Sequence, residues 1–269
     1  MVDDSVVIRG SIRAALDKLE RPLTVIEAAA GDEALAIMRQ SPVDMIFCDI
    51  HLPGISGLEA LAHAFARQER PPFMVLMSSL DAEAVREIGR KLRVYEFLRK
   101  PFRTSDVLIA VAAYDRLSRV TRALLVDDSL TARKLMRRIL ERSQFRLDIQ
   151  EAESGEEALK LAGMTKFDTI FLDANMPGMN GPETAGYLLQ ANPGTQIVMV
   201  STEQQMELIR SSQYAGAFAF LTKPFEPSDV NAVLHSAFSI RVPSLALPTH
   251  AIFSDAEGAN GSAAKRAAQ

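Results

Sequence analysis

Two short apolar runs, 123–126 and 169–172, end on carboxylates. Asp127 and Asp128 follow the run 123–126, and Asp173 follows the run 169–172. Such runs, bounded by turn residues, are typical of buried strands, and an open parallel sheet binds its ligands beyond the carboxyl ends of its strands. Three carboxylates that converge there repel one another and need a cation. Oxygen ligands without a suitably spaced histidine or cysteine favour Mg²⁺ over zinc.

Two further apolar runs lead to a hydroxyl and an amine. The run 197–200 ends at Ser201, and Lys223 comes two residues after the run 217–221. A Mg²⁺ that keeps open positions suits phosphoryl oxygens, while the lysine adds positive charge and the serine adds a donor. Such a pocket would support in-line phosphoryl transfer with Asp173 as the nucleophile. An acyl phosphate on Asp173 would then recruit Ser201 and move it.

The same landmarks occur a second time, nearer the amino terminus. Each has a counterpart 123 or 124 residues earlier in the chain: Asp3, Asp4, Asp49, Ser78 and Lys100. One order at one spacing indicates a tandem duplication of a unit of about 120 residues. The bland alternative is that these acids are only helix N-caps and solvated strand ends, but that would not reproduce the whole set twice.

Apolar runs alternate with segments of helical period within each unit. Ala132, Leu135, Met136 and Ile139 have the spacing of one helix face, and Ser129 stands where the N-cap of that helix belongs. Continuously apolar strands that alternate with helices imply a parallel sheet covered on both faces. The sequence therefore predicts an α/β protein with two consecutive (βα)5 doubly wound parallel-sheet domains, at residues 1–120 and 121–240. The composition of residues 241–269 predicts a disordered tail, with the alternative that Leu245, Leu247, Ile252 and Phe253 dock on a domain.

The first strand of the first unit is unusually short. Only Met1 and Val2 precede Asp3, whereas the apolar run 123–126 precedes Asp127. Because this strand is interior in the predicted fold, the shortening should weaken the first domain. Either the true start lies upstream, or the first unit tolerates a stump.

Composition argues against several classes of protein. The net charge of −4 disfavours a dominant nucleic-acid surface. The single cysteine, Cys48, lies in an apolar run, which excludes an intramolecular disulfide and favours an inert buried thiol. No apolar run reaches the roughly 18 residues of a membrane span, and the amino terminus lacks the pattern of a signal peptide. We therefore expect a cytoplasmic protein that binds neither nucleic acid nor membrane.

Each unit resembles a two-component response-regulator receiver domain and is similar to the single-domain regulators of chemotaxis. The resemblance covers residues 1 to about 240 and rests on the repeated acids, serine and lysine. It implies a flavodoxin-like fold, with Asp49 and Asp173 as the phosphoacceptors. It also implies that the Lys-Pro bonds before Pro101 and Pro224 are cis.

The resemblance assigns a role to each remaining landmark. Asp4 and Asp128 would ligate Mg²⁺ directly together with the phosphoacceptors, and Asp3 and Asp127 would support it through water. The backbone carbonyls of His51 and Asn175 would complete the protein ligands of the metal. Switch residues and catalytic lysines would be Ser78, Phe97 and Lys100 in the first unit, and Ser201, Phe220 and Lys223 in the second.

The two copies differ around the pocket. The second copy has Asn175 and Glu203 where the first has His51 and Leu80, and these flanking residues should set the lifetime of an acyl phosphate. The second copy also has Gly216 before its fifth strand, where a positive φ is expected. Both copies keep every chemical group. We expect Asp173 to be the more efficiently phosphorylated site.

The leading interpretation is a response regulator without a separate output domain. It would accept phosphoryl groups from a histidine kinase or a histidine phosphotransfer protein, and its only catalysis would be its own phosphorylation and dephosphorylation. Output would come from protein contacts, including a phosphorylation-dependent homodimer, or from draining phosphate as a sink.

The alternative is the regulatory receiver portion of a larger enzyme, such as a diguanylate cyclase. The roughly 30 residues after the second unit are too few for a catalytic domain, and an extended reading frame would favour this alternative. A transcription factor is disfavoured because no helix-turn-helix segment or basic face is present. The sequence names neither the kinase nor the downstream target.

Overall fold

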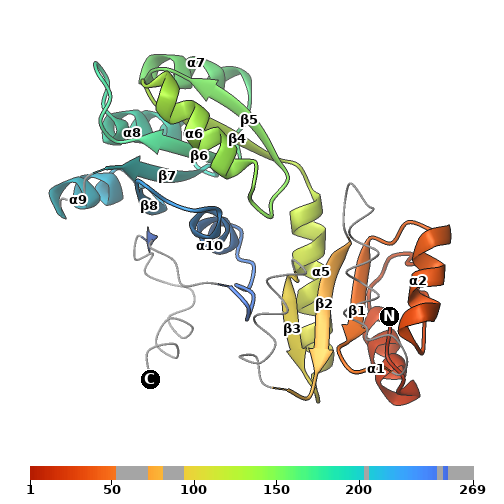
Figure 1. Cartoon of the computed structure of the whole chain (residues 1–269). Coiled ribbons are helices and arrows are strands. Elements are labelled where there is room, and N and C mark those ends of the chain that lie inside the picture. The colour runs from red at the N-terminus through yellow and green to blue at the C-terminus, as the bar shows by residue number, and fades with distance from the viewer. Residues whose placement is uncertain (53–71, 81–93, 203–205, 247–250, 254–269) are drawn as a thin grey trace. The chain divides into compact units, whose positions relative to one another are not determined.

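The computed structural model describes residues 1–52, 72–80, 94–202, 206–246 and 251–253. The chain divides into two compact units (Figure 1). Unit 1 comprises Met1–Ser118 and Ile240–Leu247, and unit 2 comprises Arg119–Ser239 and Pro248–Gln269. Each unit is an α/β structure built on a parallel sheet, as the alternation of apolar runs and helical segments predicted.

Unit 2 contains the more completely described sheet. Its strands are β4 (Thr121–Val126), β5 (Leu147–Ala152), β6 (Thr169–Asp173), β7 (Gln196–Ser201), β8 (Ala219–Thr222) and β9 (Ile252–Phe253). They lie in the order β5-β4-β6-β7-β8-β9, and all neighbours are parallel except β8 and β9. Every residue of β6 is buried, as expected for a strand covered on both faces.

Five helices connect these strands. They are α6 (Leu130–Leu140), α7 (Gly155–Met164), α8 (Gly181–Ala191), α9 (Met206–Tyr214) and α10 (Pro227–Ala237). Helix α6 packs against α10, whereas α7, α8 and α9 pack in series, so the helices form two groups (Figure 1). The hydroxyl of Ser129 accepts from the Ala132 N–H at 3.3 Å, which confirms the predicted N-cap of α6.

One part of the predicted helix face in α6 is wrong. Leu135 is 58% exposed, whereas Arg133 is 8% exposed and lies with Met136 and Leu140 on the buried face. The reason is an ion pair, because the Arg133 Nε lies 3.4 Å from a carboxylate oxygen of Glu151 on β5. A spacing rule that counts only apolar residues does not detect a buried arginine of this kind.

Unit 1 repeats the same plan in its described residues. Its elements are α1 (Val6–Leu16), α2 (Gly31–Gln40), β1 (Met45–Asp49), β2 (Phe73–Ser78), β3 (Glu96–Arg99) and α5 (Thr104–Ser118). The three strands lie parallel in the order β1-β2-β3. The remaining helices that the (βα)5 pattern requires would fall within 53–71 and 81–93, outside the described residues.

The short first strand of unit 1 is a stump. Val2 forms isolated parallel bridges with Ala28 and with Cys48 of β1, so it occupies the interior position that β4 holds in unit 2. Cys48 is buried, and burial raises the pKa of its thiol to about 12, which agrees with the expected inert cysteine.

Three local expectations are also confirmed. The Lys100-Pro101 and Lys223-Pro224 peptide bonds are cis, and Gly216 has a φ of 88°.

Among the described residues, no helix is long and apolar enough to cross a bilayer.

The described residues of the predicted tail, 241–246 and 251–253, make contacts that a disordered tail would not make. The backbone N–H of Ser244 donates to a carboxylate oxygen of Glu96 on β3 at 3.0 Å, and the Ser244 hydroxyl contacts the same oxygen. Leu245 packs against a core cluster of unit 1. Further on, Ile252 and Phe253 pair with β8. The composition rule misses these contacts because they join residues far apart in sequence.

Candidate functional site

The carboxyl ends of neighbouring strands bring the predicted groups of unit 2 to one edge of the sheet. Asp127 follows β4 directly, Asp173 and Ser201 are the last residues of β6 and β7, and Lys223 follows β8 directly. These four strands are consecutive neighbours in the sheet, so their ends meet (Figure 1). The same arrangement places Asp3, Asp49, Ser78 and Lys100 at the ends of the corresponding strands of unit 1.

A lysine joins two carboxylates in each unit. The Lys223 Nζ donates to the carboxylates of Asp127 and Asp173, at 2.6 Å to each. In unit 1 the Lys100 Nζ donates to Asp3 and Asp49, at 2.7 Å to each. Each lysine therefore holds acids from two strands together with charge-assisted hydrogen bonds, which are stronger than neutral ones.

Backbone donors orient the same four carboxylates. Asp127 accepts from the Ser129 N–H at 2.9 Å, and Asp173 accepts from the Asn175 N–H at 3.1 Å. The corresponding bonds of unit 1 run from Ser5 to Asp3 at 2.9 Å and from His51 to Asp49 at 3.2 Å. Both pockets therefore use the same set of contacts.

Burial makes the charges of this site interact strongly. Asp127 and Asp173 are 2% and 7% exposed. Burial raises the pKa of Asp173 above its ordinary value, and the nearby Asp127 adds to this against the lowering effect of Lys223. Burial alone would lower the pKa of Lys223, but its bonds to the two acids raise it, so the lysine is held charged. The same balance raises the pKa of Lys100.

Each pocket keeps an excess of negative charge that a cation would balance. In unit 1, ligand oxygens of Asp3, Asp4 and Asp49 lie within 4.8 Å of one another. The donors are all oxygen atoms, which suits a hard cation. The equivalent three acids of unit 2 do not come within this distance of one another in the described part of the chain, and Asp128 is exposed.

The start of helix α8 fixes the end of β6. The Gly181 N–H donates to the carbonyl of Ala174, the residue after Asp173, at 3.0 Å. A Cβ at position 181 would lie 2.4 Å from the backbone oxygen of Asp173, so only glycine allows this approach. The Asn180 side chain caps the helix by accepting from the Glu183 N–H at 2.9 Å.

An arginine on the first helix of each unit supports the acid pair, a role that the sequence alone did not predict. The Arg133 Nη1 donates to the carbonyl of Asp127 at 2.5 Å, and the Arg9 Nη1 donates to the carbonyl of Asp3 at 2.7 Å. Arg9 also pairs with Glu27 at 3.0 Å, as Arg133 does with Glu151. Arg9 and Arg133 are 124 residues apart, and so are Glu27 and Glu151, so the internal repeat could have indicated this pair.

The remaining predicted residues lie at three kinds of position. Ser78, Ser201, Phe97 and Phe220 are buried on their strands. The side chains of His51 and Asn175 are exposed beside the pockets, as is Leu80 at 41%. Glu203 lies outside the described residues.

A family model agrees with this geometry in both units. The model of the response regulator receiver domain matches residues 1–112 and 123–235. The chain belongs to the response regulator receiver family. It contains two receiver domains, receiver 1 in unit 1 and receiver 2 in unit 2.

Relatives of this receiver chain include both single-domain and longer regulators. The chemotaxis protein CheY of Listeria monocytogenes is 32% identical over 114 residues, which are 42% of this chain and 95% of that protein. The nitrate/nitrite response regulator NarL of Escherichia coli is 34% identical over 114 residues, which are 53% of NarL. A solved two-component system response regulator/GGDEF domain protein superposes with a TM-score of 0.62 and 23% identity. The superposition covers 88% of this chain and 96% of the solved chain, which shows that the two proteins share a fold.

Proposed function

We propose that each receiver accepts a phosphoryl group on an aspartate, Asp49 in receiver 1 and Asp173 in receiver 2. The observation that supports this most directly is the lysine that bonds to the acceptor acid and to a second acid on another strand, at 2.6–2.7 Å in both receivers. A carboxylate with one lone pair held by a lysine and another by a backbone N–H is a positioned nucleophile.

The donor in this proposal is a phosphohistidine on a histidine kinase or a histidine phosphotransfer protein. A carboxylate oxygen of Asp173 attacks the phosphorus as the phosphorus–nitrogen bond of the donor breaks. The histidine nitrogen keeps the electron pair and takes a proton from solvent. Lys223 neutralises charge that builds on the phosphoryl oxygens, and Ser201 at the end of β7 would donate a hydrogen bond to the product.

We further propose Mg²⁺ as the cation. It would be held by Asp3, Asp4 and Asp49 in receiver 1 and by Asp127, Asp128 and Asp173 in receiver 2, with the carbonyls of His51 and Asn175. The all-oxygen donor set fits this metal, and Mg²⁺ supplies positive charge to the transferring phosphoryl group when it is bound. The exposed Asp128 can turn towards the other two acids without unpacking the core, because it is not part of that core.

The output of this protein would be a protein contact or the removal of phosphate from a relay, with its own dephosphorylation as the only hydrolysis that it catalyses. We expect this exchange to take place in the cytoplasm. A phosphorylation-linked homodimer is one form of output. Sedimentation with and without beryllofluoride tests it, and an unchanged mass would count against the dimer.

A second candidate is the regulatory part of a larger enzyme, such as a diguanylate cyclase. It is favoured by the solved neighbour whose name joins a response regulator to a GGDEF domain. An open reading frame that continues into a catalytic domain would support this candidate, and phosphorylation would then control that domain.

The central experiment is labelling of the full chain with a small acyl-phosphate donor and Mg²⁺. We expect the wild type to take up label at two sites. Asp49→Ala and Asp173→Ala should each remove one site, and the double variant should remove both. Omitting Mg²⁺ should suppress labelling in every variant.

Three results would count against parts of this proposal. A wild type that takes up no label would contradict the receiver chemistry for this chain. A double variant that labels like the wild type would show that the phosphate resides elsewhere. If Asp49→Ala alone abolishes labelling, the expected preference for Asp173 is wrong.

A further inference from the structure

The second acid of each Asp-Asp pair is held less firmly than the first. The first acids, Asp3 and Asp127, use both carboxylate oxygens, one for a lysine and one for a backbone N–H. In the described part of the chain, no donor bonds to the carboxylate of Asp4 or of Asp128, and both residues are exposed. The position of this second carboxylate therefore depends on the backbone that carries it.

Arg9 on α1 bonds to that backbone at two points. Its Nη1 donates to the carbonyl of Asp3 at 2.7 Å and to the carbonyl of Asp4 at 3.3 Å. The Nη1 of Arg133 on α6 donates to the carbonyl of Asp127 at 2.5 Å, and the described residues show no bond from it to the next carbonyl. One guanidinium therefore holds the carbonyls of both acids in receiver 1, but only the first of them in receiver 2.

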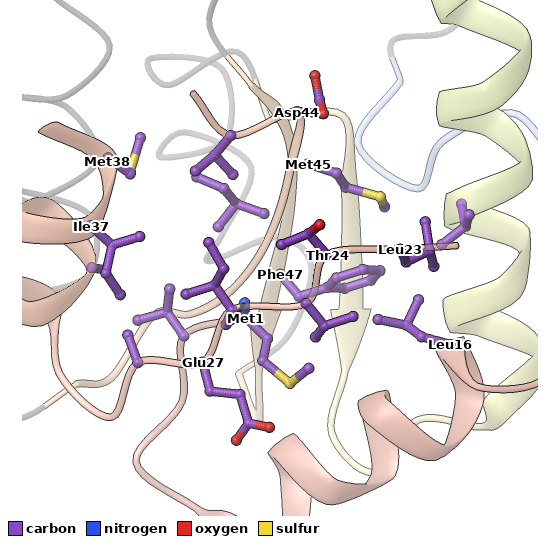
Figure 2. Close-up of a pocket in the computed structure, with 18 of the residues that line it drawn as sticks. Met1, Leu16, Leu23, Thr24, Glu27, Ile37, Met38, Asp44, Met45 and Phe47 are labelled. Atoms are coloured by element: carbon purple, nitrogen blue, oxygen red, sulfur yellow. Dashed lines mark hydrogen bonds between the residues drawn. The ribbon is translucent and has the colours of Figure 1, made fainter. Parts of the chain in front are cut away.

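A glutamate holds each arginine, and it does so more firmly in receiver 1. The Arg9 Nε donates to a carboxylate oxygen of Glu27 at 3.0 Å, and Arg13 pairs with the other oxygen at 2.6 Å. Figure 2 shows the side chain of Glu27 extending towards α1, the helix that carries both arginines. In receiver 2 the Nε of Arg133 lies 3.4 Å from Glu151, an ion pair rather than a hydrogen bond. Arg9 is thus fixed at its Nε while its Nη1 holds the acidic loop.

The acids of the two receivers follow the same difference. Ligand oxygens of Asp3, Asp4 and Asp49 lie within 4.8 Å of one another, whereas the three equivalent acids, all of them described, are not that close in receiver 2. Exposure does not explain this difference, because Asp4 and Asp128 are both exposed. The second bond of the Arg9 guanidinium does accompany it.

We propose that Arg9 is a positioning residue for the cation site of receiver 1, and that receiver 1 therefore binds Mg²⁺ more tightly than receiver 2 does. This role rests on the Mg²⁺ binding that is proposed above for both receivers. Arg9 keeps Asp4 beside the other two acids before a cation arrives. Asp128 must first turn towards its partners, and a ligand that becomes ordered only on binding loses more conformational entropy.

The direction of the effect separates positioning from charge. A guanidinium is itself a cation, so by Coulomb's law alone its removal would strengthen the binding of Mg²⁺. Glu27 already offsets part of that repulsion, because its carboxylate lies 3.0 Å from the Arg9 Nε. Loss of positioning acts in the opposite direction, since Asp4 would then have to be ordered on binding. Removal of Arg9 should therefore weaken Mg²⁺ binding.

Calorimetric titration of the full chain with Mg²⁺ alone, without a phosphoryl donor, tests this role. The Asp128→Asn chain reports the site of receiver 1, and the Asp4→Asn chain reports the site of receiver 2. We expect a Kd about tenfold lower for receiver 1. Arg9→Met in the Asp128→Asn chain should raise that Kd about tenfold, the usual size of the loss when a partner behind the metal ligands is removed.

Arg13→Met in the same chain is the matched control. It removes the same charge and a partner of the same Glu27, but Arg13 donates to neither carbonyl of the acid pair in the described structure. We expect its Kd to stay within about twofold of the parent chain. An equal weakening by Arg13→Met would assign the effect to Glu27 and overturn the role of Arg9.

Other outcomes would overturn the proposal directly. These are equal affinities of the two receivers, an unchanged or lower Kd with Arg9→Met, and no Mg²⁺ binding at either site. Denaturant unfolding without Mg²⁺ shows whether the Arg9→Met chain keeps receiver 1 folded. If it does not, Arg9→Lys decides, because lysine keeps the charge but lacks the separate Nε donor to Glu27, and an unchanged Kd there would contradict positioning. A chain that binds Mg²⁺ as expected but takes up no phosphoryl label would contradict the proposed function and leave the role of Arg9 in place.

Discussion

Each lysine of the two pockets has two carboxylate partners, and this is the residue-scale feature that most constrains the chemistry. Lys223 is in direct contact with both Asp127 and Asp173 in receiver 2. Its amine neutralises part of the charge of these buried acids. Because a phosphoryl group brings further negative charge, the lysine should matter more in the transition state than in the resting pocket.

We therefore predict that Lys223→Ala slows labelling of Asp173 by about a hundredfold, a typical loss when one preorganised charge donor is removed. The measurement is the initial rate of phosphorylation by an acyl-phosphate donor in the Asp49→Ala background, where only Asp173 can react. Lys100→Ala in the same background is the matched control and should leave the rate unchanged. Equal rates with and without Lys223 would contradict the assigned role.

The types of the reactive residues could be predicted from sequence, but some of their supports could not. Asp127 and Asp173 were placed correctly at strand ends because apolar runs show where a strand stops. Arg133 was missed because a charged residue on a helix is usually solvated, and its burial depends on Glu151 from another strand. The spacing rule counts only apolar residues, so it predicts that Leu135 is buried. In the structure Arg133 is buried and Leu135 is exposed.

At the scale of elements, the junction between β6 and α8 controls where Asp173 stands. Helix α8 contains two glycines in different surroundings. A Cβ at Gly181 would meet the backbone oxygen of Asp173 at 2.4 Å, whereas a Cβ at Gly186 would have nothing within 4 Å. The two positions therefore separate the effect of crowding from the effect of a helical glycine.

We predict that Gly181→Ala lowers the free energy of unfolding of receiver 2 by about 1–3 kcal/mol, because backbone atoms must move to admit the methyl group. Gly186→Ala should raise it by about 1 kcal/mol, since alanine is the better helix former. Denaturant unfolding measures both, and the labelling rate of Asp173 should fall only with Gly181→Ala. A Gly181→Ala chain with unchanged stability and labelling would show that the junction is not constrained.

Elements were predicted most reliably where the hydrophobic pattern was strong. Strands β4, β6, β7 and β8 match apolar runs that are visible in the sequence, and Ser129 marks the start of α6. The strands that the segment after residue 240 contacts were not predicted. The bond between Ser244 and Glu96 joins residues 148 positions apart, and the apolar residues near it indicate that the segment could dock without indicating where.

At the scale of the whole molecule, the chain carries two chemically equivalent pockets with different flanks. His51 and Leu80 lie beside Asp49, and Asn175 lies beside Asp173. We expect these side chains to control the access of water to an acyl phosphate, because the lysine and acid contacts are the same in both pockets. Two acyl phosphates formed by the same chemistry should therefore hydrolyse at different rates.

We predict that the Asp49→Ala and Asp173→Ala chains each lose label in a single exponential, with rate constants that differ by about tenfold or more. The wild type should show the sum of the two phases. Exchanging the flanks, with His51→Asn in one receiver and Asn175→His in the other, should bring the two rates closer together. Indistinguishable rates in the two single-site chains would contradict the role of the flanking residues.

The duplication itself was fully visible in the sequence, because the same ordered landmarks recur at one spacing. The length of the domains followed from it. The repeat does not predict that residues 240–247 belong to unit 1, because it indicates domains that are continuous in sequence.

The contact between Ser244 and Glu96 also decides where the polypeptide can be shortened. By sequence, the end of the second repeat near Ser239 looks like a harmless place to stop. A chain that stops there would lose the residues Ile240–Leu247, which belong to unit 1. Glu96, which is 5% exposed, would lose its partner Ser244, and the damage would fall on the receiver at the opposite end of the sequence. Residues 240–247, which follow the second repeat in sequence, are therefore part of the first domain.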